Sequence, residues 1–135
     1  MKNLIVLGGS GIGMIAISIA RELGTYTIGG FLNDVLPVGT LIGKYDQFPV
    51  IGTTDDLPKF LEDENNMFFI AYVGMQKEES VYKKITSLNI PSTRLATLIH
   101  PSAIIPKGMC KIGNGVLMAP LSQLSPDTTL EDNSI

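Results

Sequence analysis

The last part of the chain carries an apolar repeat that constrains its fold more than any other feature. Starting at Ile112, an apolar residue recurs every six positions, at Met118, Leu124 and Leu130. Small and turn-forming residues stand between them, as in "APLSQ" and "SPDTT". A period of six fits neither a helix nor a hairpin, but it is typical of a parallel β-helix, whose apolar residues point into a narrow three-sided prism. We therefore expect residues 100–135 to form the first coils of a hexapeptide-repeat β-helix.

A different pattern fills residues 1–99, where apolar runs alternate with helical segments. Strands that alternate with helices predict right-handed crossovers and a parallel sheet covered on both faces. This part is therefore expected to be a small Rossmann-like, doubly wound α/β domain. The predicted strands are 3–7, 25–32, 50–52, 66–74 and 95–99; the predicted helices are 12–23, 53–62 and 77–88, and residues 35–49 are expected to be a long loop.

Composition excludes several classes of protein. Of the 135 residues, 44% are hydrophobic and 17% are charged, and the formal net charge is −3, so the chain is globular and has no basic footprint for nucleic acid. A single cysteine, Cys110, and a single histidine, His100, leave no basis for a disulfide or a metal site. The apolar run at the N-terminus is too short for a signal peptide or a membrane span, so we expect a cytoplasmic protein without a membrane partner.

The stretch "VLGGSGIGMIA", residues 6–16, follows the first predicted strand and resembles a phosphate-binding turn. A dinucleotide fingerprint reads Gly-x-Gly-x-x-Gly, and a frame anchored on Gly8 and Gly13 places Ser10 where the middle glycine belongs. Asp34 lies 21 residues after Gly13, where a dinucleotide fold has its ribose-binding acid. The stretch is therefore a dinucleotide loop, a loop for another phosphorylated ligand, or only a tight strand-to-helix turn.

The candidate binding residues come from several predicted strand ends. Open α/β sheets bind ligands at the carboxyl ends of their strands, so these residues should converge there. No catalytic residue and no metal ligand is assigned, because His100 reads as a structural residue and Cys110 as part of an apolar wall. The predicted ligand-binding residues are Gly8, Gly9, Ser10, Gly11, Ile12, Gly13, Asp34 and Gly74.

The whole chain resembles a bacterial family, the sialic acid O-acetyltransferases and UDP-4-amino-sugar N-acetyltransferases (NeuD/PglD-like), which are left-handed β-helix acyltransferases. The resemblance rests on the glycine loop and on four segments: "FLND", "FPVIGTTDDL", "FIAYVG" and "IHPSAIIPKGMCKIGNG". The last of these, which resembles the family's junction into the β-helix, is the most specific.

The resemblance implies a function for each part. The N-terminal domain would bind a nucleotide sugar with its phosphates near the glycine loop. The β-helix would form a homotrimer with acetyl-CoA in the groove between neighbouring prisms, and a histidine of the β-helix would act as general base. The chain would then be the substrate-binding front half of an acetyl-CoA-dependent acetyltransferase that acts on a nucleotide-linked amino sugar or a sialic-acid-type sugar in surface glycan biosynthesis.

Three departures from the family pattern stand out. Ile12 replaces a histidine that the family often has in this loop, and Met75-Gln76 replaces Asp-Asn after the fourth strand. Ile105 and Ile112 are seven residues apart, which predicts a bulge in one coil.

The repeat supplies fewer than two coils, and the family's catalytic histidine would come after Ile135. We therefore expect an N-terminal fragment without acetyl transfer, stable mainly in residues 1–99 and weakly associating. The alternatives are a non-catalytic nucleotide- or sugar-binding module and, less favoured, an NAD(P)-binding oxidoreductase domain. The residues leave open which sugar and which nucleotide carrier bind, and whether oxygen or nitrogen is acetylated.

Overall fold

The computed structural model describes residues 1–71, 83 and 86–134. Its elements in chain order are β1 (Lys2–Leu7), α1 (Ile12–Leu23), β2 (Tyr26–Leu32), β3 (Leu41–Ile42), β4 (Phe48–Gly52), the short 3-10 helix η1 (Thr54–Asp56), α2 (Leu57–Leu61), β5 (Asn66–Ile70), the 3-10 helix η2 (Ser92–Arg94), β6 (Leu98–Ile99), β7 (Lys111–Ile112), β8 (Leu117–Met118) and β9 (Thr129–Leu130).

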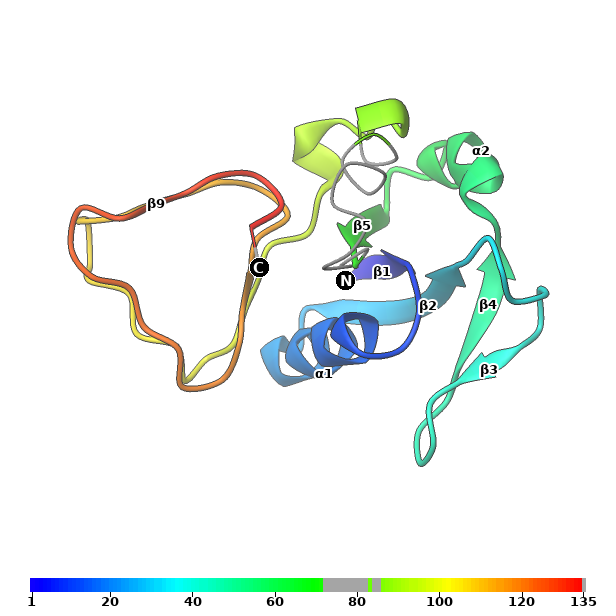
Figure 1. The fold of residues 1–135 in the computed structure, drawn as a ribbon, viewed down its shortest axis with the longest axis horizontal. Helices are drawn as coiled ribbons and strands as arrows, with labels where there is room; N and C mark the ends of the chain where they lie inside the picture. Colours follow the sequence, from blue (N-terminus) through cyan, green and yellow to red (C-terminus); the bar gives the residue numbers. More distant parts are fainter. Residues whose placement is uncertain (72–82, 84–85, 135) are drawn as a thin grey trace.

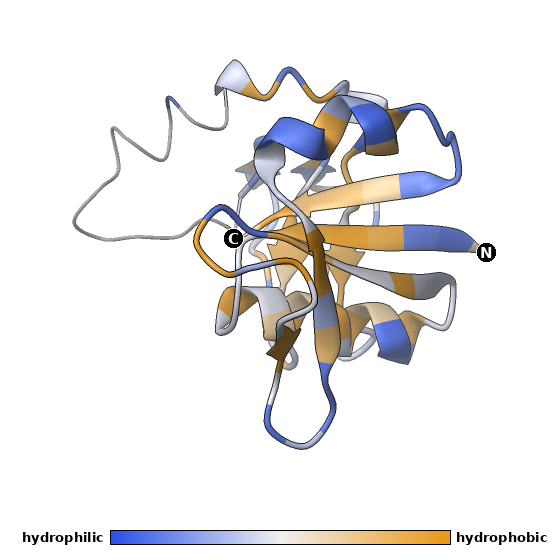
Figure 2. Cartoon of the chain, turned by 90° about the vertical axis from the view of Figure 1, so that its right-hand side faces the viewer, coloured by the Kyte–Doolittle hydropathy of each residue, from blue (hydrophilic) through white to orange (hydrophobic). Residues whose placement is uncertain are grey.

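The first part of the chain is a doubly wound sheet, which confirms the predicted fold class. Its strand order is β3-β4-β2-β1-β5, and β4, β2, β1 and β5 run parallel. Figure 1 shows α1 on one face of this sheet and α2 on the other. In β1, Leu4 and Val6 join the core on the α1 side, whereas Ile5 and Leu7 join the core on the α2 side. Burial on both faces explains why residues 4–7 of the strand are all apolar (Figure 2).

Residues 35–49 differ from the predicted loop, because they hold β3 and the start of β4. These two strands form an antiparallel hairpin, with Leu41 opposite Pro49. Gly43 has φ 120°, and a Cβ at this position would lie 2.0 Å from the Asp46 carbonyl oxygen, so the turn requires glycine. A two-residue strand is too short to leave a period in the sequence, which is why the pattern missed it.

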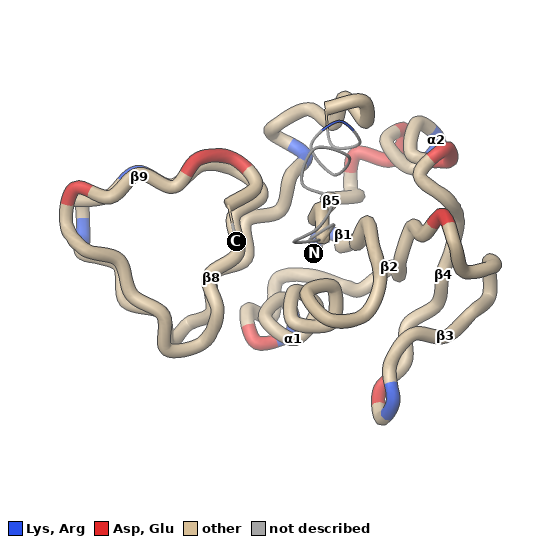
Figure 3. Tube along the Cα trace, viewed as in Figure 1, with Lys and Arg blue, Asp and Glu red and all other residues tan. Residues whose placement is uncertain are grey.

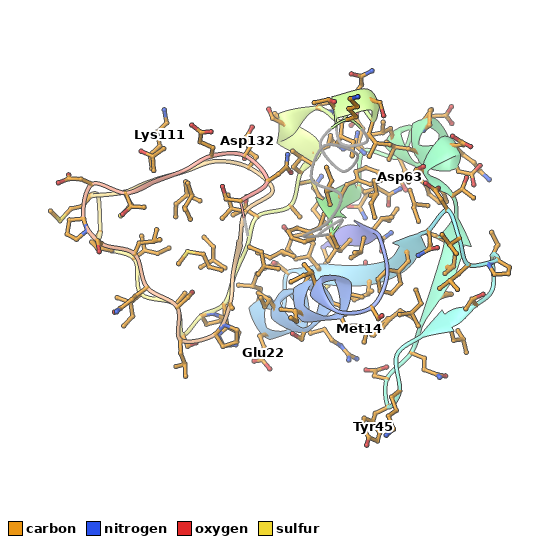
Figure 4. The ribbon with its side chains drawn as sticks, viewed as in Figure 1. Met14, Glu22, Tyr45, Asp63, Lys111 and Asp132 are labelled. Atoms are coloured by element: carbon orange, nitrogen blue, oxygen red, sulfur yellow. The ribbon has the colours of Figure 1, made fainter. Side chains whose placement is uncertain are left out.

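The hairpin is attached to the C-terminal end of α1. Arg21, in the last turn of α1, forms an ion pair with Asp46, and its guanidinium lies 5.5 Å from the centre of the Phe48 ring. Tyr45 projects from the tip of the hairpin into solvent (Figure 4).

The predicted strand 95–99 does not join the sheet as expected. Leu95 forms only a single parallel bridge, to Phe68, and Leu98–Ile99 pairs with Leu117–Met118 in the second part of the fold. The predicted strand 66–74 is observed as β5, which ends at Ile70. Residues 72–74 and most of the predicted helix 77–88 lie outside the described residues.

After Leu95 the chain runs twice around a triangular path (Figure 1). Successive turns of this coil pair in parallel, β6 with β8 and β7 with β9, as the predicted fold class requires. Pairing partners are 19 residues apart at Ile104 and Gln123 but 18 apart at Lys111 and Thr129. Between Ile104 and Lys111 the first turn of the coil therefore has one residue more than the matching segment of the second turn. This is the segment where the seven-residue spacing predicted a bulge.

Helix α1 joins the sheet and the coil into one hydrophobic core. Leu98 and Leu117 of the coil are 0% and 6% exposed and belong to the same buried cluster as Ile17 and Ala20 of α1. Neighbouring side chains of a strand point to opposite faces, so Ile99 points into the prism while Leu98 points at α1. The division of the chain at residues 99 and 100 into two units stays a prediction. Within the described residues, no helix has the length and apolarity that a membrane span would need.

The shared core predicts that the α1 contact contributes strongly to stability. Replacing Leu98 with Ala should lower the free energy of unfolding by about 2–5 kcal/mol, because it leaves a cavity between α1 and the coil. Leu121→Ala is the matched control: this side chain is 85% exposed, so we expect a change of about 0.5 kcal/mol or less. Urea denaturation of both variants measures this difference, and equal midpoints would contradict the shared core.

Candidate ligand-binding site

The glycine loop leaves β1 at the point where the strand order of the sheet reverses. β1 lies between β2 and β5, so consecutive crossovers go to opposite sides of it. The Gly8 N–H donates to the Leu32 carbonyl at 3.0 Å, and the Ala71 N–H donates to the Leu7 carbonyl at 2.8 Å. The loop is thereby attached to the carboxyl ends of both neighbouring strands. In open α/β sheets such a switch point is where ligands bind.

Two glycines of the loop are required by close packing. Gly8 has φ 132°, and a Cβ there would lie 3.1 Å from the Ala71 carbonyl oxygen. A Cβ on Gly13 would lie 2.9 Å from Cε1 of Phe31 in β2. Gly13 thus has the helix–strand packing role that the third glycine has in a dinucleotide fingerprint. Packing alone explains these two residues, whichever ligand the loop binds.

The start of α1 offers backbone donors. Gly11 is the N-cap, with φ 81° and no side-chain cap hydrogen bond, and the Ile15 N–H donates to the Gly11 carbonyl at 3.1 Å. The N–H groups ahead of Ile15 have no partner within the helix and lie at its positive end. An anion bound there would be held by backbone N–H groups and the helix dipole, because residues 3–20 include no charged side chain. In Figure 3 the glycine loop carries no charge; charged residues lie around α2, at the hairpin tip, at the C-terminal end of α1 and on the outer part of the coil, and the acidic Asp34 follows β2.

Asn33, at the end of β2, contacts the loop directly. Its Nδ2 donates to the Gly8 carbonyl at 3.0 Å, and its Oδ1 accepts from the N–H groups of Val35 and Leu36, both at 2.8 Å. We did not predict this residue as part of the site. An asparagine after a strand signals a local turn, but no sequence pattern indicates a contact with Gly8.

Asp34 lies at the same edge of the sheet, held by the turn after β4. Its Oδ1 accepts from the Thr54 N–H and from the Thr54 hydroxyl, each at 2.8 Å, and its Oδ2 also lies 2.8 Å from that hydroxyl. Thr54 is only 5% exposed. A ribose would therefore have to compete for a carboxylate that already accepts hydrogen bonds from the protein.

The structure brings most of the predicted binding residues together. Residues 8–13 form one continuous loop and first helical turn, and Gly9 lies beside Asn33, so that a Cβ on Gly9 would be 3.4 Å from Asn33 Nδ2. Asp34 is the next residue in the chain after Asn33. Gly74 lies outside the described residues.

Ile12 connects this site to the coil. With Ile15 it lines a mostly apolar cavity of about 340 Å³ whose opposite wall includes Met118, Ala119 and Leu124 of the second turn of the coil. A ligand on the glycine loop would therefore have an open, apolar region beside it, between α1 and the coil. A larger depression of about 450 Å³ is lined by residues of the coil alone, among them Lys111 and Asp132, which Figure 4 labels.

Of the two residues interpreted as structural, His100 makes a local contact with Ser102, which in turn contacts the next turn of the coil, and Cys110 contacts the next turn directly. Nδ1 of His100 accepts from the Ser102 N–H at 3.0 Å, and the Ser102 hydroxyl oxygen accepts from the Leu121 N–H at 2.8 Å. The Cys110 thiol donates to the Ser125 carbonyl at 3.3 Å.

The described residues offer no cluster of metal ligands here, and the group whose pKa is raised lies away from the site. Among the described residues, no cluster of three or more His, Cys, Asp or Glu side chains could hold a metal ion. Burial raises the pKa of the Tyr26 phenol, but Tyr26 begins β2 at the opposite edge of the sheet.

Comparison with known proteins gives one matching family. The family model described as the PglD N-terminal domain matches residues 3–85. No curated protein matches the chain.

Among the solved structures that are similar over almost the whole chain are two acetyltransferases. The acetyltransferase domain of PglB from Neisseria gonorrhoeae FA1090, in complex with acetyl coenzyme A, is 28% identical with a TM-score of 0.71. A mutant of perosamine N-acetyltransferase from Caulobacter crescentus, in complex with CoA and GDP-perosamine, is 21% identical with a TM-score of 0.75, which indicates the fold alone. Each match covers 98% of this chain but only 60% and 59% of the two neighbours, so the chain spans about three fifths of their length.

The loop geometry predicts different effects for two adjacent glycine substitutions. Gly8→Ala should lower the free energy of unfolding by about 1–3 kcal/mol, because φ 132° is strained for alanine and the new methyl group would contact the Ala71 carbonyl. Gly9→Ala is the control, since its nearest neighbour would be at an ordinary distance of 3.4 Å. Thermal denaturation compares the two, and an equal loss in both variants would contradict the packing role of Gly8.

Proposed function

Because the chain belongs to the PglD N-terminal domain family, we propose that it is the nucleotide-sugar-binding part of an acetyl-CoA-dependent sugar acetyltransferase. The 28% identical PglB domain, solved with acetyl coenzyme A, supports the co-substrate. The perosamine N-acetyltransferase, solved with CoA and GDP-perosamine, supports a nucleotide-linked amino sugar as the acceptor class. The proposal includes the binding residues Gly8–Gly13 and Asp34, a homotrimer for the whole acetyltransferase with only weak association of this chain alone, a cytoplasmic location and a role in glycan biosynthesis.

The observation that carries the proposal is the uncharged loop at the switch point. The diphosphate would bind to the backbone N–H groups between Gly9 and the first turn of α1. Such a site suits a diphosphate because the helix dipole and several N–H groups act on the same anion. The nucleoside would then extend toward the turn after β4, where Thr54 lies.

The environment of Asp34 limits what its carboxylate can offer to the ribose of a ligand. A dinucleotide fold uses its acid at this position to accept hydrogen bonds from the ribose hydroxyls. Here Thr54 donates to that carboxylate from both its N–H and its hydroxyl. Asp34 would therefore contribute less to ribose binding than in a dehydrogenase.

The sugar would lie on the coil side of the loop. Ile12 adjoins both the loop and the apolar cavity shared with the coil. A sugar on the diphosphate would project into this cavity, toward the element along which acetyl-CoA is proposed to bind. In the reaction, the acceptor nitrogen or oxygen would attack the thioester carbonyl, the CoA thiolate would leave, and a general base would take the acceptor's proton. We assign no base, because Nδ1 of His100 accepts a hydrogen bond from Ser102.

Isothermal titration calorimetry tests the ligand class. We expect UDP or GDP to bind more tightly than NADH. We also expect UDP and GDP to bind more tightly than the corresponding nucleosides, uridine and guanosine. Ser10→Asp, which puts a negative charge in the exposed loop, should weaken the binding of the diphosphate by about tenfold or more, equivalent to about 1.4 kcal/mol. The control is Ser18→Asp, which lies on the exposed face of α1 and should leave binding unchanged. Tighter binding of NADH than of either diphosphate would overturn the proposal in favour of a dinucleotide domain.

A further inference from the structure

We propose that Asn33 is a positioning residue that sets the direction of the Gly9 N–H group in the glycine loop and thereby the affinity for a nucleoside diphosphate. This inference rests on the function proposed above. It concerns a residue that touches the loop but is not itself assigned to contact the ligand.

The Asn33 amide uses its donor and its acceptor at the same time. Nδ2 donates to the Gly8 carbonyl, and Oδ1 accepts from the Val35 and Leu36 N–H groups. The chemistry of these partners fixes the orientation of the amide, because a carbonyl can only accept and an N–H can only donate. An aspartate would keep the acceptor and lose the donor, and an alanine would lose both.

The contact of Asn33 with Gly8 restrains the peptide unit that carries the Gly9 N–H, one of the proposed donors to the diphosphate. The Gly8 carbonyl and the Gly9 N–H belong to one planar trans peptide, so they point in opposite directions. Asn33 holds the carbonyl toward β2 at 3.0 Å, and the Gly9 N–H is therefore directed away from β2. Gly8 needs this restraint because a glycine has no Cβ, so its backbone can adopt many conformations besides the observed one with φ 132°.

The other side of the amide ties the loop to the rest of the sheet edge. Oδ1 closes the turn at residues 33–36. This turn is held to β4 by the Asn33 N–H, which donates to the Gly52 carbonyl at 3.0 Å, and to η1 by the hydrogen bonds between Asp34 and Thr54. Asn33 therefore couples the ends of β1, β2 and β4 into one unit. The direction of the Gly9 N–H is fixed before a ligand arrives, which reduces the ordering that binding would otherwise require.

Calorimetry with Asn33→Ala tests the effect on binding without adding a charge near the phosphates. We expect roughly tenfold weaker binding of UDP and GDP and little change for uridine and guanosine, since only the diphosphates reach the loop. Asn3→Ala is the matched control. Asn3 Nδ2 also donates to an oxygen at 3.0 Å, that of the Asn66 side chain, but Asn3 lies near the opposite end of β1. Affinity within twofold of wild type for Asn33→Ala would overturn the inference.

The 15N relaxation order parameter of the Gly9 N–H in the ligand-free protein gives a second readout that does not depend on the proposed function. It should fall in Asn33→Ala and also in Asn33→Asp, which keeps the turn but cannot donate to Gly8, and it should be unchanged in Asn3→Ala. A wild-type order parameter in Asn33→Asp would overturn the inference, because the turn alone would then suffice. If the wild-type chain binds neither UDP nor GDP, the proposed function fails, and the order parameter of Gly9 alone decides the role of Asn33.

Discussion

The burial of α1 on two sides is the interaction on which the rest of the structure depends. One side of the helix packs on β1 and β2, and another packs on Leu98 and Leu117 of the coil. The helix also begins at the glycine loop, so its position determines where that loop lies relative to both parts. This double burial explains why the helix is apolar nearly all round, with its first charged residue at Arg21. A helix that only covered a sheet would carry a polar face.

Much of the fold could be predicted where a local signal, such as a helix-ending glycine, or a long repeat marks an element. The predicted helix 12–23 has the observed bounds, since Gly24 ends it in the left-handed conformation with φ 70°. The period of six predicted a coil because it repeats over four positions. The hairpin at β3 and the pairing of Leu98 with Leu117 were missed for the opposite reason: two-residue strands have no measurable period, and their partners are chosen by tertiary packing.

The candidate site divides in the same way. The glycines of the loop were visible in the sequence because a tight strand-to-helix turn requires them. The contact of Asn33 with Gly8 joins residues 25 positions apart, and that of Thr54 with Asp34 joins residues 20 apart. Such contacts depend on which strands are neighbours, and a single sequence does not contain the strand order. What Asp34 can offer a ligand therefore became clear only from the arrangement of the strand ends.

The position of Leu98 and Leu117 bears on how such chains diversify. A change of sequence period marks a natural place to cut or recombine genes, but here the period changes inside a shared hydrophobic core. An exchanged coil would have to bring outward-facing apolar residues that match α1, or else leave that helix face in contact with water. The two parts of the chain are thus under a common constraint. Substitutions on the α1 face of the coil and on the coil face of α1 should be inherited as compatible pairs.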